Sequence, residues 1–292
     1  MTEKESSPQV YRGLRRETPL PCCILTRDDL RTLYVRLGEK VREGLEPQLA
    51  ELERPDGFDP NEWEELKGQA RDAAQLTAMV FGAAGEQVYA TEEDGLLDRN
   101  LPDRITSVIF DSATALKSNV NVDARNRFKL TIDFSNPPGF NRYDPTSQPT
   151  LNGSVLEVTG PDETWVSGVH ELVMQFFKGR ETARRLIHSG NIFFAVQCLV
   201  VIPGSIWLSY RMVEVLPDAL THAHPVLTTT LYLYGFLLAF ITFRLVKLGV
   251  RRAWPYVELE GDSKVLGRFF IATATTGLIV AFVYDLLKEL VT

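Results

Sequence analysis

The residue pattern closest to a catalytic motif begins at His170 and Glu171. In zinc proteases of the HExxH type, a second histidine lies four residues after the first, so that both imidazoles bind one zinc ion from the same side of a helix. Met174 occupies that position here, and methionine is not among the usual zinc ligands, which are Cys, His, Asp and Glu. We therefore predict no zinc-protease site.

Other residues that could bind a metal or a phosphate also lack the partners that such sites need. His222 and His224 could offer two nitrogens to a metal, but no cysteine or acidic cluster accompanies them, so a solvated loop is favoured. Gly82 and Gly85 are not followed by the lysine of a phosphate-binding loop. We expect no metal and no cofactor. The sequence identifies no catalytic residue.

Three long apolar segments in the last hundred residues predict a helical membrane domain over residues 189–292. The segments lie near 192–210, 226–243 and 269–287. The first would reach roughly 28 Å as a helix, close to the hydrocarbon thickness of about 30 Å. The third meets Asp285 near its end, so it spans only with tilt or with the acid at the interface. The prediction is about three spans.

Basic residues on either side of these segments predict the direction of insertion, because short loops rich in Lys and Arg stay in the cytoplasm. They precede the first span and follow the second, which places the N-terminal domain inside and the C-terminus outside. The same side chains are candidates for contact with anionic lipid headgroups, although setting the topology is the simpler role. These candidates are Arg184, Arg185, Arg244, Lys247, Arg251 and Arg252.

Small residues at four-residue intervals suggest close packing between the spans, and with it a homo-oligomer formed through them. They are Gly235, Ala239, Thr273, Gly277 and Ala281. The alternative is that small residues are simply common in membrane helices. Pro203 and Gly204, in the middle of the first span, predict a kink or a packing notch.

Residues 21–188 predict a cytoplasmic α+β domain, with an antiparallel sheet covered by helices on one face. Residues 26–45 repeat apolar side chains at helical spacing after the N-cap candidate Thr26, and 161–177 form a second amphipathic segment. Alternation over 127–135 predicts a strand. Runs at 76–91, 105–116 and 154–160 predict a hairpin and further strands. Residues 1–20 are expected to be a polar N-terminal segment outside this domain.

Charge and cysteine content limit the environment and the partners. The net charge of −7 argues against a nucleic-acid binder, which needs a basic face to replace phosphate counterions. Three cysteines are too few for a disulfide framework, so the thiols are expected to be reduced. No signal peptide is recognisable at the N-terminus. The lack of a recognisable targeting signal, together with the apolar segments, favours a multi-pass protein of a bacterial inner membrane, with the lipid bilayer as its main partner.

The sequence thus favours a membrane-anchored cytoplasmic module that binds or senses a ligand and signals through helix contacts. A non-enzymatic role is preferred because no catalytic constellation is recognisable. Two alternatives remain open. One is an oligomeric pore-forming effector triggered by the cytoplasmic domain, and the other is a membrane-bound enzyme whose site is assembled from distant residues.

Overall fold

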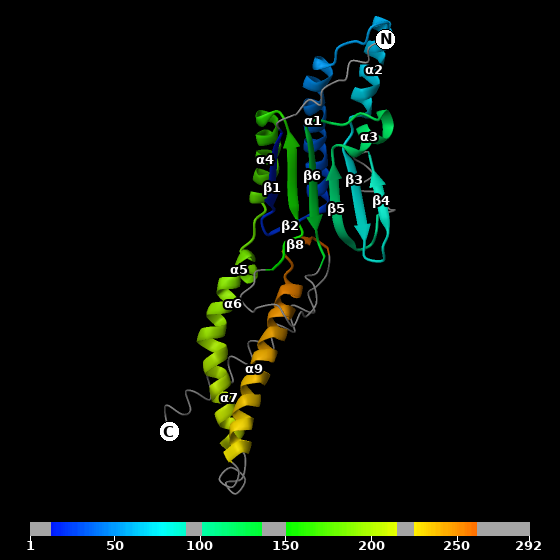
Figure 1. Ribbon diagram of the computed structural model, residues 1–292. Coiled ribbons are helices and arrows are strands. Elements are labelled where there is room, and N and C mark those ends of the chain that lie inside the picture. The colour runs from blue at the N-terminus through cyan, green and yellow to red at the C-terminus, as the bar shows by residue number, and fades with distance from the viewer. Residues whose placement is uncertain (1–12, 92–100, 136–149, 215–224, 262–292) are drawn as a thin grey trace, which may run out of the picture. The chain divides into compact units, whose positions relative to one another are not determined.

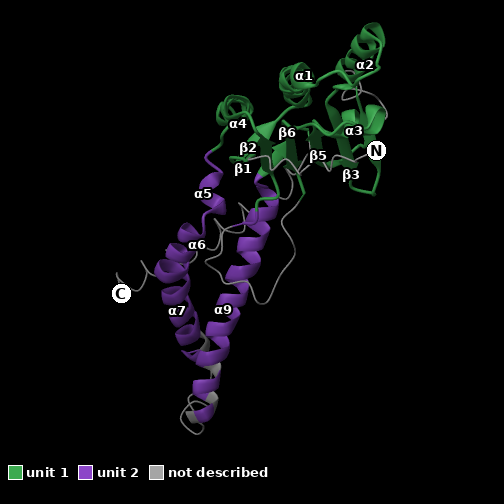
Figure 2. Cartoon of the chain, turned by 45° about the horizontal axis from the view of Figure 1, so that its top comes forward, with its two compact units in different colours: residues 1–135, 152–182, 257–261 green, residues 136–151, 183–256, 262–292 purple. Residues whose placement is uncertain are grey.

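A computed structural model describes residues 13–91, 101–135, 150–214 and 225–261 of the chain (Figure 1). The chain divides into two compact units (Figure 2). Unit 1 comprises residues 1–135, 152–182 and 257–261, and unit 2 comprises residues 136–151, 183–256 and 262–292. Segment 183–256 of unit 2 is therefore a helical insertion in unit 1, because the chain returns to unit 1 at Val257.

Unit 1 contains a six-stranded antiparallel sheet in the order β1-β7-β6-β5-β3-β4. Its strands are β1 (Leu14–Pro19), β3 (Thr77–Gly82), β4 (Gln87–Ala90), β5 (Ile105–Asp111), β6 (Arg127–Asp133) and β7 (Val155–Gly160). In β6, Phe128, Leu130 and Ile132 are buried whereas the residues between them are not, as expected for a strand with one face in the core. The predicted strand and hairpin are confirmed.

Helices cover one face of this sheet, which confirms the predicted α+β class (Figure 2). They are α1 (Arg27–Glu51), α2 (Pro60–Ala73) and α4 (Glu163–Lys178), with the short α3 (Thr114–Val120) after β5. Helix α1 begins with a capping box in which Thr26 and Asp29 each accept the other's backbone N–H. In α4, Asp162 accepts from the N–H groups of Thr164 and Trp165.

Three expectations about unit 1 need correction. Residues 14–19, expected in a polar segment outside the domain, form edge strand β1 paired with β7. The strand expected over 105–116 ends at Asp111, because its carboxylate accepts hydrogen bonds from the N–H groups of Ala113 and Thr114, and the chain then turns into α3. Residues 257–259, expected in the membrane domain, form β8 (Val257–Leu259) of unit 1.

A second, two-stranded sheet pairs β2 (Cys23–Leu25) with β8 in parallel. The two strands are separated in sequence by the rest of unit 1 and by the whole helical insertion. Residues Cys22, Cys23 and Leu25 have no exposed surface, and Val257 is 1% exposed. This small sheet is therefore part of the core of unit 1.

Unit 2 contains two long apolar helices. The first is continuous through α6 (Gly190–Val196), the π-helical turn η2 (Gln197–Val201) and α7 (Ile202–Glu214), and it follows the single-turn α5 (Arg185–His188). The second is α9 (Pro225–Ala253). The π turn lies just before Pro203, which has no N–H to donate to the preceding turn, and there the N–H of Ile202 bonds to the carbonyl of Gln197.

Two helices are long and apolar enough to cross a membrane, Gly190–Arg211 and Thr228–Ala253. Length and composition alone are weak evidence, since the core helix of a soluble protein can pass the same test. A core helix would be mostly buried, whereas only 17% and 11% of these segments are buried. The third predicted span, 269–287, lies outside the described residues, and so do Thr273, Gly277 and Ala281.

Candidate functional site

Strand β2 is bonded to both points where the chain connects unit 1 to the helical insertion. On the outgoing side, Cys23 forms an antiparallel bridge with Glu181, and the N–H of Thr182 donates to the carbonyl of Cys22 over 2.9 Å. On the returning side, β8 pairs with β2, and the N–H of Glu260 donates to the carbonyl of Leu25 over 2.7 Å. We call residues 22–25, 181–182 and 257–260 the junction.

The two connections lie on opposite edges of β2. Successive carbonyls of a strand point to alternate edges, and the acceptors used by Thr182 and Glu260 belong to Cys22 and Leu25. Neighbouring strands are about 4.8 Å apart, so the two connections are held about 10 Å apart. Two packed helices have axes about 8–10 Å apart. The junction thus holds the two points where the chain leaves and re-enters unit 1 at a separation close to the spacing of a packed helix pair.

Two buried thiols form the centre of the junction. Neither Cys22 nor Cys23 is in a disulfide, and neither has exposed surface. Burial, together with the neighbouring Cys22, raises the pKa of Cys23 to about 12, so its thiol is neutral and unreactive at physiological pH. The Sγ of Cys22 lies 3.5 Å from Oγ1 of Thr182. These cysteines therefore serve as small core residues.

A second contact next to the junction joins the end of α4 to the start of α1. Arg180 donates from Nε and from one terminal nitrogen to Oδ1 of Asp29, over 2.8 and 2.5 Å. Its other terminal nitrogen donates to the carbonyl of Phe176 over 3.0 Å, and the guanidinium lies 3.8 Å from the centre of the Phe176 ring. Arg180 directly precedes the outgoing connection, so α1 is linked to that connection through one side chain.

The charge of Asp29 is maintained by this contact. Partial burial would raise the pKa of Asp29, but the hydrogen bonds from Arg180 and Thr26 outweigh it and hold the pKa below its ordinary value. The carboxylate accepts from the backbone of Thr26 as well as from Arg180. The carboxylate of Asp29 therefore caps the start of α1 and binds Arg180 at the same time.

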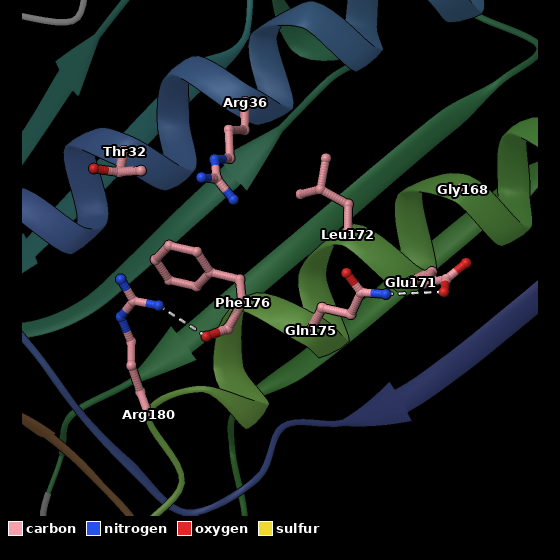
Figure 3. Close-up of a pocket in the computed structure, with 8 residues that line it drawn as sticks. All are labelled: Thr32, Arg36, Gly168, Glu171, Leu172, Gln175, Phe176 and Arg180. Atoms are coloured by element: carbon pink, nitrogen blue, oxygen red, sulfur yellow. Dashed lines mark hydrogen bonds between the residues drawn. The ribbon is translucent and has the colours of Figure 1, made fainter.

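A groove of about 540 Å³ opens between α1 and α4 beside this contact (Figure 3). Figure 3 shows Arg36 extending from α1 towards α4, and Arg180 lying beside the Phe176 ring. Glu171 and Gln175 are bonded to each other over 2.9 Å along α4. Thr32, Gly168 and Leu172 complete the lining.

The width of the groove is set by a close approach of α1 and α4 at its other end. The indole N–H of Trp165 donates to the carbonyl of Lys40 over 2.9 Å. A Cβ on Gly44 would lie 2.8 Å from atoms of this ring, so only glycine fits there. Trp165 is 7% exposed, as expected for a residue on the apolar side of the amphipathic segment 161–177.

In unit 2 the two long helices meet at Ser209 and Gly235. The hydroxyl of Ser209, which is 2% exposed, donates to the carbonyls of Ser205 and Tyr232 over 2.8 and 3.3 Å. A Cβ on Gly235 would collide with Oγ of Ser209 and lie 3.2 Å from its Cα. The wider packing role of Gly235 and Ala239 between copies of the chain stays a prediction.

The basic residues predicted to contact lipid do not share one environment. Lys247 is 7% exposed, and its ammonium lies 5.1 Å from the centre of the Phe193 ring, with the Arg251 guanidinium 5.2 Å from the same ring. Arg185 and Arg252 are exposed, whereas Arg184 and Arg244 are half-buried. Contact of these six residues with lipid headgroups stays a prediction.

His188, close to the start of the first long helix, is buried in a polar setting. It is 3% exposed, and its Nδ1 lies 2.9 Å from Oγ1 of Thr150. The centre of its ring lies 5.1 Å from that of the Tyr256 ring, with the two planes tilted by 50°. Burial lowers the pKa of His188 to about 4, and the positive charge of Arg251 adds to this effect. The imidazole is therefore neutral at pH 7.

The histidine of the incomplete zinc motif has a structural partner. Nε2 of His170 lies 3.0 Å from Oγ1 of Thr18 in β1, and partial burial and then Arg16 lower its pKa. Within the described ranges, no three His, Cys, Asp or Glu side chains lie together in a group that could hold a metal ion. His222 and His224 lie outside those ranges.

Sequence reasoning singled out neither the junction nor the groove. Of the residues in the capping box, the sequence predicted only the N-cap Thr26, which is recognisable from its place before the helical pattern. Arg180 is 151 residues from Asp29, so no local pattern connects them. Comparison of the chain with protein-family models, with curated proteins and with solved structures found no match.

Proposed function

We propose that the protein is a membrane-anchored sensor in which unit 1 binds a ligand and transmits the binding to the helical insertion through strand β2. The observation that carries the proposal is the bonding of β2 to both connections, at Cys22 and at Leu25. A shift of β2 would move the two ends of the insertion relative to each other. Because buried hydrogen-bonded strands are rigid, such a shift would be transmitted and not absorbed.

Membrane anchoring is supported by apolar side chains on the surface of both long helices. Leu199 is 75% exposed, Ile206 62% and Leu233 59%. Large contiguous apolar surfaces indicate contact with lipid or with another protein. The buried hydroxyl of Ser209, bonded between the helices, is typical of polar contacts within membrane helix pairs.

In the proposed topology, unit 1 lies in the cytoplasm of a bacterial cell and the chain spans the inner membrane three times, with residues 269–287 as the third span. The basic residues at the unit 1 ends of the insertion support this direction of insertion. Those among them that are exposed, Arg185 and Arg252, would contact anionic headgroups.

The topology is tested with a fluorescent protein that folds only in the cytoplasm, fused separately before Met1 and after Thr292. An active N-terminal fusion and a silent C-terminal fusion are expected. Two active fusions would mean an even number of spans and would refute the third. Recovery of the untagged chain in the soluble fraction after alkaline extraction would overturn membrane anchoring altogether.

Transmission through β2 is tested with a nitroxide label on Cys198. This thiol is exposed on the first long helix, whereas Cys22 and Cys23 are buried, so the full chain in detergent micelles labels selectively. Glu260→Pro removes the N–H that donates to Leu25, and Glu260→Ala is the matched control that keeps it. The proposal predicts that the label's spectrum changes with Glu260→Pro alone. Identical spectra for both variants would refute transmission through the junction.

A further inference from the structure

The groove between α1 and α4 has a chemical character that the sensor proposal does not specify. Arginine carries five N–H donors and no acceptor. Arg180 uses three of its donors within the protein, two towards Asp29 and one towards Phe176. The other two N–H groups of Arg180 are on the same guanidinium, which these bonds hold in a fixed orientation beside the groove. A fixed fork of donors loses little entropy when it binds an oxyanion.

Arg36 adds a second guanidinium from the opposite wall. Its side chain is exposed and extends towards α4 (Figure 3), and no acceptor for it is found among the described residues. One guanidinium group from α1 and one from the chain just after α4 make one end of the groove rich in donors and positive charge. Arginine pairs of this kind bind phosphate or carboxylate through paired N–H···O bonds.

The other end of the groove is different, because Glu171 and Gln175 offer an acidic and an amide side chain. A second negative charge there would be repelled by the carboxylate of Glu171. Hydroxyl groups would instead find both an acceptor and a donor there, in the carboxylate of Glu171 and the amide of Gln175. The volume of about 540 Å³ falls in the range of about 300–1,000 Å³ that is usual for small-molecule sites. It exceeds what a single phosphate fills.

We propose that this groove binds a small phosphorylated polyol, with the phosphate between Arg36 and Arg180 and the hydroxyl groups towards Glu171 and Gln175. The inference rests on the proposed function, because it names the ligand class that the sensor would detect. Arg180 is adjacent to Glu181 and Thr182 of the junction. A phosphate bound to Arg180 would weaken its bonds to Asp29 and so act on the outgoing connection.

Binding is tested by titration calorimetry of the full chain in detergent micelles with ribose 5-phosphate as the probe. Ribose and inorganic phosphate, each lacking one half of the probe, are the ligand controls. Saturable binding of ribose 5-phosphate is expected, with about tenfold weaker binding of phosphate and none of ribose. Absence of saturable binding by ribose 5-phosphate would overturn the proposal.

Arg36→Gln is the decisive variant, since Arg36 is exposed and has no acceptor within the described residues, so its loss is expected to leave folding intact. We expect it to weaken binding about tenfold or more. Arg42→Gln is the matched control, because Arg42 is an exposed arginine of the same helix that lines another surface. Equal affinities of Arg36→Gln and the unchanged chain would also overturn the proposal.

The source of the phosphorylated polyol is decided in nanodiscs of phosphatidylcholine with and without phosphatidylinositol 4-phosphate. Loss of ribose 5-phosphate binding only in the presence of that lipid assigns the groove to a headgroup, and unchanged binding assigns it to a soluble ligand.

The spectrum of the Cys198 label distinguishes the binding proposal from the transmission proposal. Binding without a spectral change keeps the site and refutes transmission, whereas a response to Glu260→Pro without binding keeps transmission and refutes the site.

Discussion

Arg180 and Asp29 are 151 residues apart in sequence, and the guanidinium of the first donates two hydrogen bonds to one carboxylate oxygen of the second. Both side chains are mostly shielded, with 30% and 17% of their surface exposed. The pair joins the chain just after α4 to the first turn of α1, one residue before the chain pairs with β2. The ion pair therefore links helix α1 to the segment through which the chain leaves unit 1 for the helical insertion.

Replacing Asp29 by Asn should lower the free energy of unfolding by about 1–2 kcal/mol, because a partly buried charged hydrogen bond is lost. Urea unfolding of the full chain in micelles measures this, with Asp28→Asn as the control. Asp28 is an exposed acid of the same turn, and its change should stay within about 0.5 kcal/mol. Equal losses for both variants would show that the contact with Arg180 contributes nothing.

The same pair predicts an acid dependence of stability. Since the folded-state pKa of Asp29 is lowered, the stabilisation is fully present above the ordinary aspartate pKa of about 3.9 and is lost as the pH falls through the folded pKa. The unchanged chain should therefore lose more stability on acidification than Asp29→Asn. Parallel pH profiles of the two chains would contradict this.

Replacing Gly44 by Ala should destabilise unit 1 by about 1–3 kcal/mol, since the added methyl group overlaps the Trp165 ring and separates α1 from α4. Gly38→Ala is the matched control on the same helix, where an added Cβ meets no atom within 4 Å. That change should stabilise the chain by about 0.5–1 kcal/mol. Thermal unfolding distinguishes the two, and a stabilised Gly44→Ala would show that the helices separate freely.

Histidine protonation should be resolved by nuclear magnetic resonance of the full chain in micelles with labelled imidazoles. The His188 signal, identified by its absence in His188→Gln, should titrate near pH 4 because burial and Arg251 disfavour the charged form. Its lowered pKa contributes stability that is present above about pH 6.5 and is lost as the pH falls towards 4. A midpoint near 6.5 would mean that the site near the first helix is open to water.

Replacing Gly235 by Val should weaken the pairing of the two long helices, since its side chain would occupy the place of Ser209. Gly204→Ala is the control, because a Cβ there meets nothing within 4 Å. The thermal midpoint of the full chain in micelles should fall with the first change and should not fall with the second, because alanine fits that helical position. A constant midpoint in both would show that the helix contact adds no stability.

The elements that the sequence predicts correctly are those whose signals lie within a few residues. The N-cap at Thr26, the alternation over 127–135 and the apolar runs near 192–210 and 226–243 depend on local spacing, which the backbone imposes directly. Pro203 predicted an irregularity in the first long helix. The structure has a π-helical turn just before it, at Gln197–Val201, and the sequence did not predict this form.

The sequence by itself determined the α+β class of unit 1 and the two apolar helices, because helix and strand periodicity and length are local properties of the chain. Only the tertiary structure decided that β1 closes the sheet, that β8 returns to pair with β2, and that Arg180 meets Asp29. The strands β2 and β8 have three residues each, too few to show a period. Contacts between residues more than a hundred positions apart depend on the packing of the whole unit, which no local pattern records.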